Sequence, residues 1–341
     1  MLQVAINQII RGLHLNREMA RQAMGEIMDG AATQAQIGAF LASLRLKGEQ
    51  TEEIIGFAQA MRERALSFPI ASERLVDTCG TGGDGADTFN ISTAAAIVAA
   101  SAGVEIAKHG NRAVSSKSGS ADVLEAMGIP ISLSPEAAAD CLRQTNLAFL
   151  FAPLYHQAMK HAAGARKELA IRTVFNLLGP LCNPARAKRQ LLGIYDRKLL
   201  PVIAEVLGEL GVDRALVVAG DDGLDELTVT GPSQIAELRD GVVTTYTIEP
   251  TQFGLGTYQL EALRGGDAAL NATIIREVFY GKRGAARDIV LLNAGAILYL
   301  ADRVPSLEIG VIRAAELIDR GDVIAKLNEI REVAGGMTHA S

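Results

Sequence analysis

Short apolar segments alternate with helical stretches from residue 74 onward, and this alternation most limits what the chain can fold into. Segments of this length that are apolar throughout are typical of strands buried on both faces. Parallel strands need a crossover of about a dozen residues between them, and a helix provides it. The pattern therefore predicts an α/β fold in which helices cover a mostly parallel sheet. The expected strands cover residues 74–79, 104–107, 147–151, 190–195 and 214–219.

The start of the chain differs, because helical periodicity returns repeatedly over its first ~65 residues without a strand pattern between. Asn16 and Thr51 stand where helix N-caps are expected, since their side chains can accept a free backbone N–H, and a helix between them is expected to begin at about Thr33. We therefore predict two domains. A small all-helical domain should cover residues 1–70, and a larger α/β domain that binds the ligand should cover residues 71–341.

Further local signals fill in the α/β region. Helices are expected over residues 92–102 and 120–127, and the pair Ser134-Pro135 is typical of an N-cap followed by the first helical residue. Residues 235–247 are expected to form a hairpin around an Asp-Gly turn. Helical patterns dominate again from Leu270 to the end of the chain.

Composition and charge limit the partners. The chain has 341 residues, with 33 Lys and Arg against 39 Asp and Glu, which gives a net charge of −6. A protein that binds duplexes by neutralising phosphates needs the opposite sign, and 4% aromatic residues without Trp offer few platforms for stacked bases. The apolar stretches are too short for a membrane span, and the N-terminus is unlike a signal peptide. We expect a cytoplasmic protein that binds neither nucleic acid nor membranes.

Residues 80–85, Gly-Thr-Gly-Gly-Asp-Gly, follow the first expected strand and match the GxGxxG pattern of dinucleotide-binding folds. Glu105 even lies near the expected acidic position, about twenty residues further on. In that fold, however, the helix begins within the glycines, so that its N-terminus meets the pyrophosphate. Here Ser92 and Thr93, the expected capping residues, come later, and no Gly-Lys-Ser/Thr ending marks a P-loop. We therefore reject both motifs.

Donors of hydrogen bonds to anions are concentrated around these glycines. The glycines let backbone N–H groups approach a ligand closely, and residues 90–93, Asn-Ile-Ser-Thr, add side-chain donors at a helix N-terminus. Residues 108–112 and 115–120 add four hydroxyl groups and three cations, namely Lys108, Arg112 and Lys117. One phosphate needs fewer donors than this. The sequence predicts a ligand with two separated phosphate groups.

Acidic side chains follow another expected strand. Residues 221–226, Asp-Asp-Gly-Leu-Asp-Glu, come directly after the strand at 214–219. Paired acids in a turn are often only solvated, but these are expected to lie beside polyphosphate donors. Mg²⁺ prefers a few carboxylates together with substrate oxygens. The segment therefore indicates a magnesium site.

Several long motifs resemble those of the anthranilate phosphoribosyltransferase family. They lie at residues 77–84, 89–93, 108–112, 120–125 and 172–181, the last being Arg-Thr-Val-Phe-Asn-Leu-Leu-Gly-Pro-Leu. The resemblance spans nearly the whole chain, including the helical start and the acid pair Asp225-Glu226. It implies transfer of the phosphoribosyl group of phosphoribosyl pyrophosphate to the amine of anthranilate, with release of pyrophosphate, in tryptophan biosynthesis.

The resemblance also assigns residues. Those matching magnesium positions are Ser92, Asp225 and Glu226, and those matching anthranilate contacts are Gly80, Asn111 and Arg166. It further implies two Mg²⁺ ions, a homodimer joined through the helical domain, and completion of that domain by helices within residues 163–182. Residues that would hold the phosphoribosyl donor are Gly80, Gly83, Asp84, Thr88, Asn90, Ile91, Ser92, Thr93, Lys108, His109, Gly110, Asn111, Arg112, Ala113, Val114, Ser115, Ser116 and Ser120.

The implied chemistry is electrostatic. Cleavage at C1 of the ribose builds positive charge on the sugar and negative charge on pyrophosphate, which Mg²⁺ and nearby cations stabilise. The amine of anthranilate is already a nucleophile, so we expect no acid–base dyad, and Lys108, Asp225 and Glu226 should act through their charges. We interpret His109 as structural or in contact with the donor, and Cys79 as a small buried filler.

Two other activities compete with this hypothesis. A nucleoside phosphorylase of the same fold would cleave nucleosides with phosphate, but the acid pair Asp225-Glu226 and the matched Arg166 argue against it. A DNA-binding relative of the family should have a basic surface, and a net charge of −6 has the wrong sign.

Overall fold

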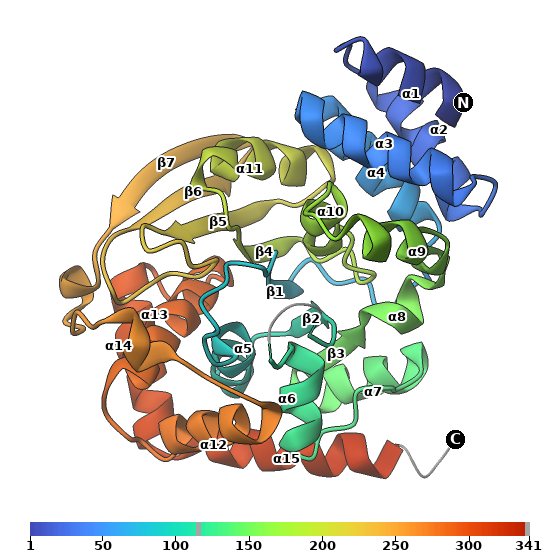
Figure 1. Cartoon of the computed structure of the whole chain (residues 1–341). Helices are drawn as coiled ribbons and strands as arrows, with labels where there is room; N and C mark the ends of the chain where they lie inside the picture. Colours follow the sequence, from blue (N-terminus) through green and yellow to red (C-terminus); the bar gives the residue numbers. More distant parts are fainter. Residues whose placement is uncertain (114–116, 338–341) are drawn as a thin grey trace.

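The computed structural model describes residues 1–113 and 117–337 and confirms an α/β fold with a helical bundle at the N-terminal end. Figure 1 shows the bundle at one corner of the molecule and the sheet across the larger body, with helices on both of its faces. Within the described ranges, every helix is too short or too polar to span a lipid bilayer.

The described strands form one seven-stranded sheet in the order β3-β2-β1-β4-β5-β6-β7. The first five strands of this order, from β3 to β5, run parallel. β6 pairs antiparallel with β5, and β6 and β7 form the expected antiparallel hairpin. The hairpin turns at Asp240 and Gly241, whose φ angles are 53° and 76°. The strand bounds are β1 (Val76–Gly80), β2 (Ile106–Gly110), β3 (Leu147–Phe151), β4 (Arg189–Gly193), β5 (Arg214–Gly220), β6 (Ser233–Arg239) and β7 (Val242–Ile248).

The strand order reverses between β1 and β4. From β1 the chain builds outward through β2 and β3 on one side, and then returns to add β4 and β5 on the other. Crossovers of this kind leave a crevice at the carboxyl ends of the two central strands, where open α/β sheets bind ligands. The fold thus places the ends of β1 and β4 at the natural position for a site.

The bundle forms because four amphipathic helices bury one apolar face each. Asn16 Oδ1 accepts the N–H of Met19 at 2.9 Å, which confirms this predicted cap. Thr33, where the third helix was expected to begin, is its N-cap residue. The helices are α1 (Leu2–Ile10), α2 (Arg17–Met28), α3 (Gln34–Lys47) and α4 (Thr51–Glu63); α9 (Lys160–Leu169) and α10 (Phe175–Leu181) share their core.

Thr51 was the wrong choice for the fourth cap. Gln50 is the N-cap residue, and Thr51 is the first residue of α4. The free N–H of Gln50 is accepted by the Glu53 carboxylate at 2.9 Å, and Lys47 Nζ lies 2.8 Å from the same oxygen. The Glu53 side chain is thus fully buried in an ion pair with Lys47. The position of the cap therefore depends on a residue of the neighbouring helix α3.

Helices cover the two faces of the sheet because successive strand residues point in opposite directions. Leu191 of β4 packs into a core with α5 and α13, whereas Leu192 packs into the core that contains α11 and the bundle. The remaining α-helices are α5 (Ile91–Ser101), α6 (Ser120–Ala126), α7 (Pro135–Thr145), α8 (Ala152–Tyr155), α11 (Leu200–Glu209), α12 (Ala268–Phe279), α13 (Ala285–Leu300), α14 (Leu307–Asp319) and α15 (Asp322–Met337).

Two boundaries near the glycines differ from the prediction. Helix α5 begins at Ile91 with Asn90 as its N-cap residue, so Ser92 and Thr93 lie in the first turn and do not cap it. Strand β2 runs on to Gly110, so Lys108 belongs to the strand and does not follow it. Both shifts bring polar side chains onto rigid backbone at the carboxyl edge of the sheet.

Candidate active site

The glycine segment and the acidic segment meet at the carboxyl ends of β1 and β4. The Asp225 carboxylate accepts the backbone N–H of Gly82 at 2.6 Å. A Cβ atom on Gly80 would collide with the same carboxylate, and one on Gly193 would collide with the Asp225 backbone. Glycine at both strand ends therefore lets the acidic segment approach the sheet edge.

Helix α5 joins this junction through its first turn. Glu226 accepts the backbone N–H of Ser92 at 3.2 Å. Lys108, only 3% exposed, donates from its ammonium group to the carbonyl oxygen of Thr78 and to Ser92 Oγ, the latter at 3.2 Å. Glu226 and Lys108 thus both contact Ser92, at the N-terminus of one helix, where anions bind favourably.

Three carboxylates lie close together here, those of Asp84, Asp225 and Glu226. Burial raises the pKa of both Asp225 and Glu226, and the neighbouring negative charges raise it further. A divalent cation would relieve this repulsion, so the residues fit Mg²⁺. In the described part of the chain, no three His, Cys, Asp or Glu side chains have the spacing of a ligand cluster. The arrangement therefore suits an ion held by one or two carboxylates and by phosphate oxygens.

The acidic segment divides into two parts with different surroundings. Asp222 accepts the hydroxyl of Thr228 at 2.6 Å, which stabilises the turn, and Asp221 pairs with Arg197 at 3.1 Å on the surface. Asp225 and Glu226 alone among these acids face the glycine segment in the described structure. The earlier two acids are structural, as acids in turns often are.

The predicted donor residues after β2 are only partly available to a ligand. Arg112 is exposed and pairs with Asp122 at 3.0 Å and with Glu125 at 2.6 Å, so its charge is already balanced. A phosphate would have to compete with these two carboxylates for Arg112, whose contact with the donor stays a prediction. Ser120 Oγ donates to the carbonyl oxygen of Asn111 at 3.3 Å. Val114, Ser115 and Ser116 lie outside the described residues.

Arg166 lies on α9 and stacks over the ring of Phe175 at 5.0 Å. Within the described ranges it has no carboxylate partner, and burial lowers its pKa. Further along the same connection, Arg172 stacks over Tyr195 at 4.3 Å, and its guanidinium lies about 3.4 Å from where a Gly83 Cβ would be. The segment between α9 and α10 therefore reaches the glycine segment with an arginine that belongs to a family motif but received no role from the sequence.

His109 and His156 form a buried pair whose ring centroids are 5.1 Å apart. Burial lowers the pKa of His109 to about 3 and that of His156 to about 4. Both rings are therefore neutral at pH 7, and each Nε2 has no partner within the described residues. Burial also raises the pKa of the Cys79 thiol well above its usual range, which makes it a poor nucleophile.

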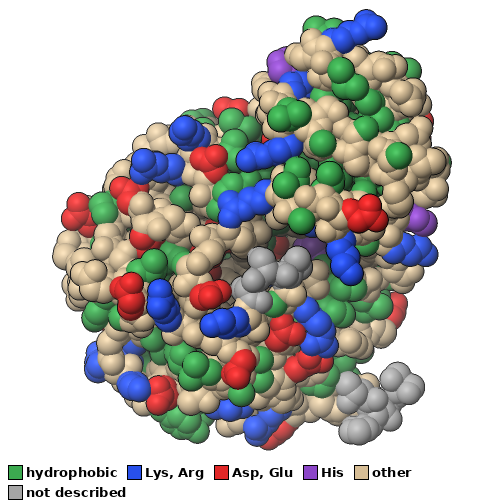
Figure 2. Space-filling model, in the orientation of Figure 1, with side chains coloured by type: hydrophobic (Ala, Val, Ile, Leu, Met, Phe, Trp, Pro, Cys, Tyr) green, Lys and Arg blue, Asp and Glu red, His purple; other side chains and the backbone are tan. Residues whose placement is uncertain are grey.

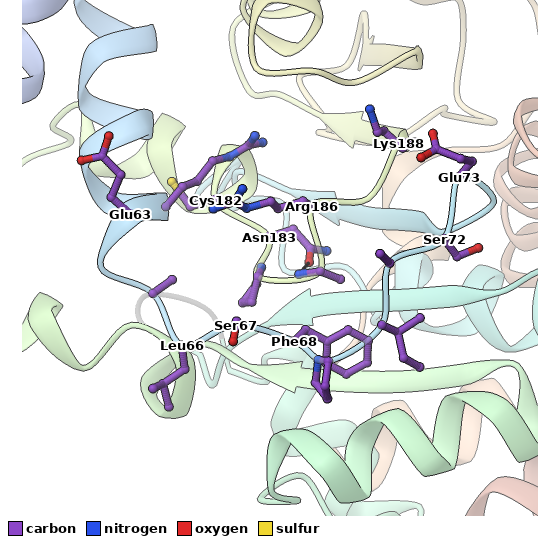
Figure 3. Close-up of a pocket in the computed structure, with 17 residues that line it drawn as sticks. Glu63, Leu66, Ser67, Phe68, Ser72, Glu73, Cys182, Asn183, Arg186 and Lys188 are labelled. Atoms are coloured by element: carbon purple, nitrogen blue, oxygen red, sulfur yellow. Dashed lines mark hydrogen bonds between the residues drawn. The ribbon is translucent and has the colours of Figure 1, made fainter.

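A separate cavity of about 670 Å³ lies at the opposite edge of the sheet (Figure 3). Residues 62–73, which lead into β1, and residues 182–188, which lead into β4, form its walls. In Figure 3, Arg186 extends across it toward the helix that carries Glu63. Because β1 and β4 begin here and end at the acid pair, this cavity is not the candidate active site. On the face in Figure 2, basic and acidic side chains are interspersed and form no broad basic patch among the described residues.

Sequence reasoning missed two buried amides that support the site. Asn271 of α12 donates to Asn90 Oδ1 at 3.0 Å. Asn293 of α13 donates to the carbonyl oxygen of Leu227 at 2.8 Å and accepts its N–H at 3.2 Å. A polar residue inside an otherwise apolar helix was the available signal for Asn293, but nothing local identified its partner.

The fold and the site together define a glycosyl transferase. The helical bundle domain of a glycosyl transferase family matches residues 3–65, and the a/b domain of that family matches residues 72–324. The chain is 75% identical to an anthranilate phosphoribosyltransferase of Brevibacillus brevis over 100% of both chains. It belongs to the anthranilate phosphoribosyltransferase family.

Solved structures agree with this assignment. The crystal structure of anthranilate phosphoribosyltransferase from Thermus thermophilus matches with a TM-score of 0.91 and 41% identity over 97% of this chain and 99% of that one. The Saccharomyces cerevisiae enzyme in complex with PRPP and Mg matches with a TM-score of 0.89 and 28% identity over 98% of both chains. A further structure of the yeast enzyme, in complex with 4-fluoroanthranilate, matches with a TM-score of 0.87 and 26% identity over 98% of both chains.

Proposed function

We propose that this chain transfers the phosphoribosyl group of 5-phosphoribosyl 1-diphosphate to the amine of anthranilate and releases pyrophosphate, as a step of tryptophan biosynthesis. The observation that carries the proposal is that Lys108 and Glu226 meet at the first turn of α5 while the neighbouring Asp225 contacts the glycine segment. The ligands named for the yeast relative, PRPP with Mg in one structure and 4-fluoroanthranilate in another, support the same two substrates.

The residues of this chain would stabilise charge and position the reactants. Lys108 and the positive N-terminal end of α5 would face the negative charge that develops on the departing pyrophosphate. Burial of Lys108 strengthens this interaction, because the ammonium group is held in place and largely desolvated before the substrate arrives. Since the buried His109 and His156 are neutral and both lie away from solvent, a general base is not part of the proposal.

Magnesium would supply the remaining positive charge, by polarising the pyrophosphate oxygens as a Lewis acid. We infer that two ions bind, and that Ser92, Asp225 and Glu226 hold them together with substrate oxygens. The like-charge repulsion between the acidic side chains supports this assignment, because it is relieved when a cation binds. Gly80, Gly83, Asp84, Thr88 and the donor residues already named from Asn90 to Ser120 complete the proposed donor site.

Gly80, Asn111 and Arg166 form the proposed acceptor site. Arg166 supports this role because its guanidinium is held against Phe175 without a carboxylate partner in the described chain, which leaves it able to pair with the carboxylate of anthranilate. We further propose a cytoplasmic homodimer joined through the helical domain of residues 1–70, with α9 and α10 completing that domain and residues 71–341 binding the donor. The packing of α9 against α2 and α3, and of α10 against α4, supports the completion of the helical domain.

An assay of the full-length protein tests the function directly. The protein is supplied with phosphoribosyl pyrophosphate and Mg²⁺, with or without anthranilate. The release of pyrophosphate and the consumption of anthranilate are then measured in the same reaction. We expect equal rates of both when anthranilate is present and no release when it is omitted. Pyrophosphate release that is indifferent to anthranilate would contradict the proposed acceptor.

Two substitutions separate the donor site from the acceptor site. A lost charge-assisted hydrogen bond is worth about 1.5–3 kcal/mol, or about ten- to a hundredfold in affinity. Arg166→Ala should raise the KM for anthranilate by that factor and leave the KM for phosphoribosyl pyrophosphate nearly unchanged. Lys108→Ala should do the reverse. Arg143→Ala, which removes an exposed arginine of α7 paired with Asp140, is the control and should change neither value. Equal weakening of both substrates by Arg166→Ala would assign the residue to the fold.

A further inference from the structure

Asn271 is a buried asparagine of α12, 1% exposed, whose amide reaches the N-terminus of α5, 181 residues earlier in the chain. Its Nδ2 donates to Asn90 Oδ1 at 3.0 Å, and its Oδ1 accepts the backbone N–H of Gly266 at 2.8 Å. Asn90 is the N-cap residue of α5, at the edge of the candidate site. One side chain therefore connects α12, the segment before it, and the helix start that faces the ligand.

The segment before α12 lies against the backbone that leads into α5. Gly265 donates its N–H to the carbonyl oxygen of Asp87 at 2.8 Å, and Phe89 donates its N–H to the carbonyl oxygen of Leu263 at 3.2 Å. A Cβ atom on Gly265 would lie 2.7 Å from the Phe89 nitrogen and would collide with Asn271 Oδ1. Glycine is thus required at position 265 for this close approach. Asn271 connects the two segments, because it bonds to Gly266 before α12 and to Asn90 before α5.

The hydrogen bonds fix which way each amide points. Asn90 Nδ2 donates to the backbone carbonyl oxygen of Ser118 at 3.1 Å. Three hydrogen bonds form a chain: the Gly266 N–H donates to Asn271, Asn271 donates to Asn90, and Asn90 donates to the Ser118 carbonyl. The chain begins at a backbone donor and ends at a backbone acceptor, and these two ends determine the orientation of both amides. Rotating either amide by 180° would set two acceptors against each other.

This orientation matters for a negatively charged ligand. The Nδ2 of Asn90 carries two N–H groups, and one of them has no partner in the described residues. If the amide were reversed, its oxygen lone pairs would take that place and would repel a phosphate. The Ser118 hydroxyl also donates to Asn90 Oδ1, at 3.4 Å, so Asn271 makes the shorter of the two hydrogen bonds to that oxygen. Asn271 and Ser118 therefore select together the amide orientation that offers a donor.

We propose that Asn271 is a positioning residue for the phosphoribosyl donor, and that it acts by holding the Asn90 amide with an N–H directed at a phosphate group. The proposal rests on the proposed function, because it names the donor substrate. It also assigns a role in the site to α12, which carries no residue of the matched donor motifs.

The substitution Asn271→Asp tests the proposal with little change of shape. The new carboxylate still accepts the N–H of Gly266, but it replaces the donor that faces Asn90 Oδ1 with an acceptor. We expect the KM for phosphoribosyl pyrophosphate to rise about tenfold, as for the loss of one hydrogen bond to a charged group, while the KM for anthranilate stays unchanged. Steady-state kinetics of the full-length protein at saturating Mg²⁺ give both values.

A double-mutant cycle shows whether Asn271 acts through Asn90. In an Asn90→Ala background the amide is gone, so Asn271→Asp should produce almost no further rise in the KM for the donor. Asp267→Ala is the control for a general loosening of α12, since Asp267 caps that helix by accepting the N–H of Leu270 at 2.9 Å. It should lower the melting temperature and leave the KM for the donor unchanged.

Three results would overturn the inference in an active wild-type enzyme: an unchanged KM for the donor in Asn271→Asp, the same tenfold rise in the Asn90→Ala background, or an equal rise in Asp267→Ala. If Asn271→Asp does not fold, Asn271→Ala removes the same contact without adding charge and enters the same cycle. A wild-type protein without turnover of phosphoribosyl pyrophosphate would instead contradict the proposed function, which the first assay distinguishes.

Discussion

Charged side chains are buried close together near the carboxyl edge of the sheet. Asp77, fully buried below Lys108, accepts the N–H of His109 at 3.1 Å and the Gln190 amide at 3.3 Å. Burial raises the pKa of Asp77, and a hydrogen bond from Asn183 and the charge of Lys108 offset only part of this rise. The two groups therefore stabilise each other's ionised form in a setting where either alone would lose free energy. This arrangement holds the cation in place before any phosphate binds.

Removing one acid from the proposed metal site should separate stability from activity. Glu226→Gln keeps an oxygen that can accept the N–H of Ser92 but removes one negative charge from a group of carboxylates that repel one another. In the presence of a chelator we expect the melting temperature to rise by about 2–3 °C, equivalent to about 1 kcal/mol. Turnover with Mg²⁺ should fall severely.

Thermal unfolding with and without Mg²⁺, combined with the activity assay, checks this prediction. Asp221→Asn is the matched control, because Asp221 belongs to the same segment but pairs with Arg197 on the surface. It should leave turnover unchanged. A Glu226→Gln variant that turns over like the wild type would remove Glu226 from the metal site.

The buried histidines make stability depend on pH. The pKa of His109 is lowered to about 3 and that of His156 to about 4, whereas an unfolded histidine titrates near 6.5. Below pH ~6.5 the unfolded chain therefore binds protons that the folded chain does not, and the unfolding free energy falls as the pH is lowered. At pH 5 each histidine should account for a loss of about 2 kcal/mol relative to pH 7.5.

Urea unfolding at the two pH values measures this loss. His156→Gln should reduce the difference between pH 7.5 and pH 5 by about 2 kcal/mol. His14→Gln, which changes an exposed histidine before α2, should retain the full wild-type difference. An equal response of both variants would mean that carboxylates, and not the buried pair, determine the acid sensitivity.

At the scale of the elements, the C-terminal helices support the site without contributing to its motifs. α12 holds the start of α5 through Asn271, and α13 holds the residue after the acid pair through Asn293. Asn293 makes both backbone hydrogen bonds of Leu227, as a neighbouring strand would. A helix otherwise filled with apolar side chains thus fixes the loop on which Glu226 lies.

Asn293→Leu should loosen that loop. The substitution leaves the buried N–H and C=O of Leu227 without their partner, and each such group costs about 1–3 kcal/mol. We expect a lower melting temperature and a several-fold higher Mg²⁺ concentration for half-maximal activity. Ile297→Val, one turn further along the same buried face, is the control for destabilisation alone and should keep the wild-type Mg²⁺ response. Identical Mg²⁺ responses in both variants would contradict the role of Asn293.

At the scale of the whole molecule, the bundle leaves apolar side chains exposed on two packed helices. Ile10 of α1 is 66% exposed, and Leu46 of α3 is 89% exposed. Figure 2 shows hydrophobic side chains across the visible face of the bundle. Apolar groups that cluster on a surface mark sites of association, which is the physical argument for the proposed dimer.

Leu46→Glu should therefore dissociate the protein. We expect the wild type to sediment as a dimer at micromolar concentration and Leu46→Glu as a monomer, because a charge in an apolar interface is not solvated. Ile312→Glu, on the exposed face of α14 far along the chain, is the matched control and should remain dimeric. A monomeric wild type in this measurement would contradict the proposed assembly.

Local patterns in the sequence predicted the order of the strands and helices around the site, with several ends displaced by one or two residues. Periodicity and capping chemistry act over three or four residues, so Asn16 and Ser134 could be recognised as caps, and each accepts the expected backbone N–H. The same local reasoning placed the glycine segment after a strand and the acid pair after another. The family motifs then connected these segments to one reaction.

Only the tertiary structure decided which distant groups meet. It pairs Arg112 with Asp122 and Glu125, and Asn271 with Asn90, although nothing in the local pattern of either segment specifies its partner. Such contacts depend on the strand order and on which helix covers which face. Local sequence preferences do not encode the strand order, because the order results from burying the apolar faces of all elements at once. The positions of Asn271 and Asn293 beside the site result in turn from that order.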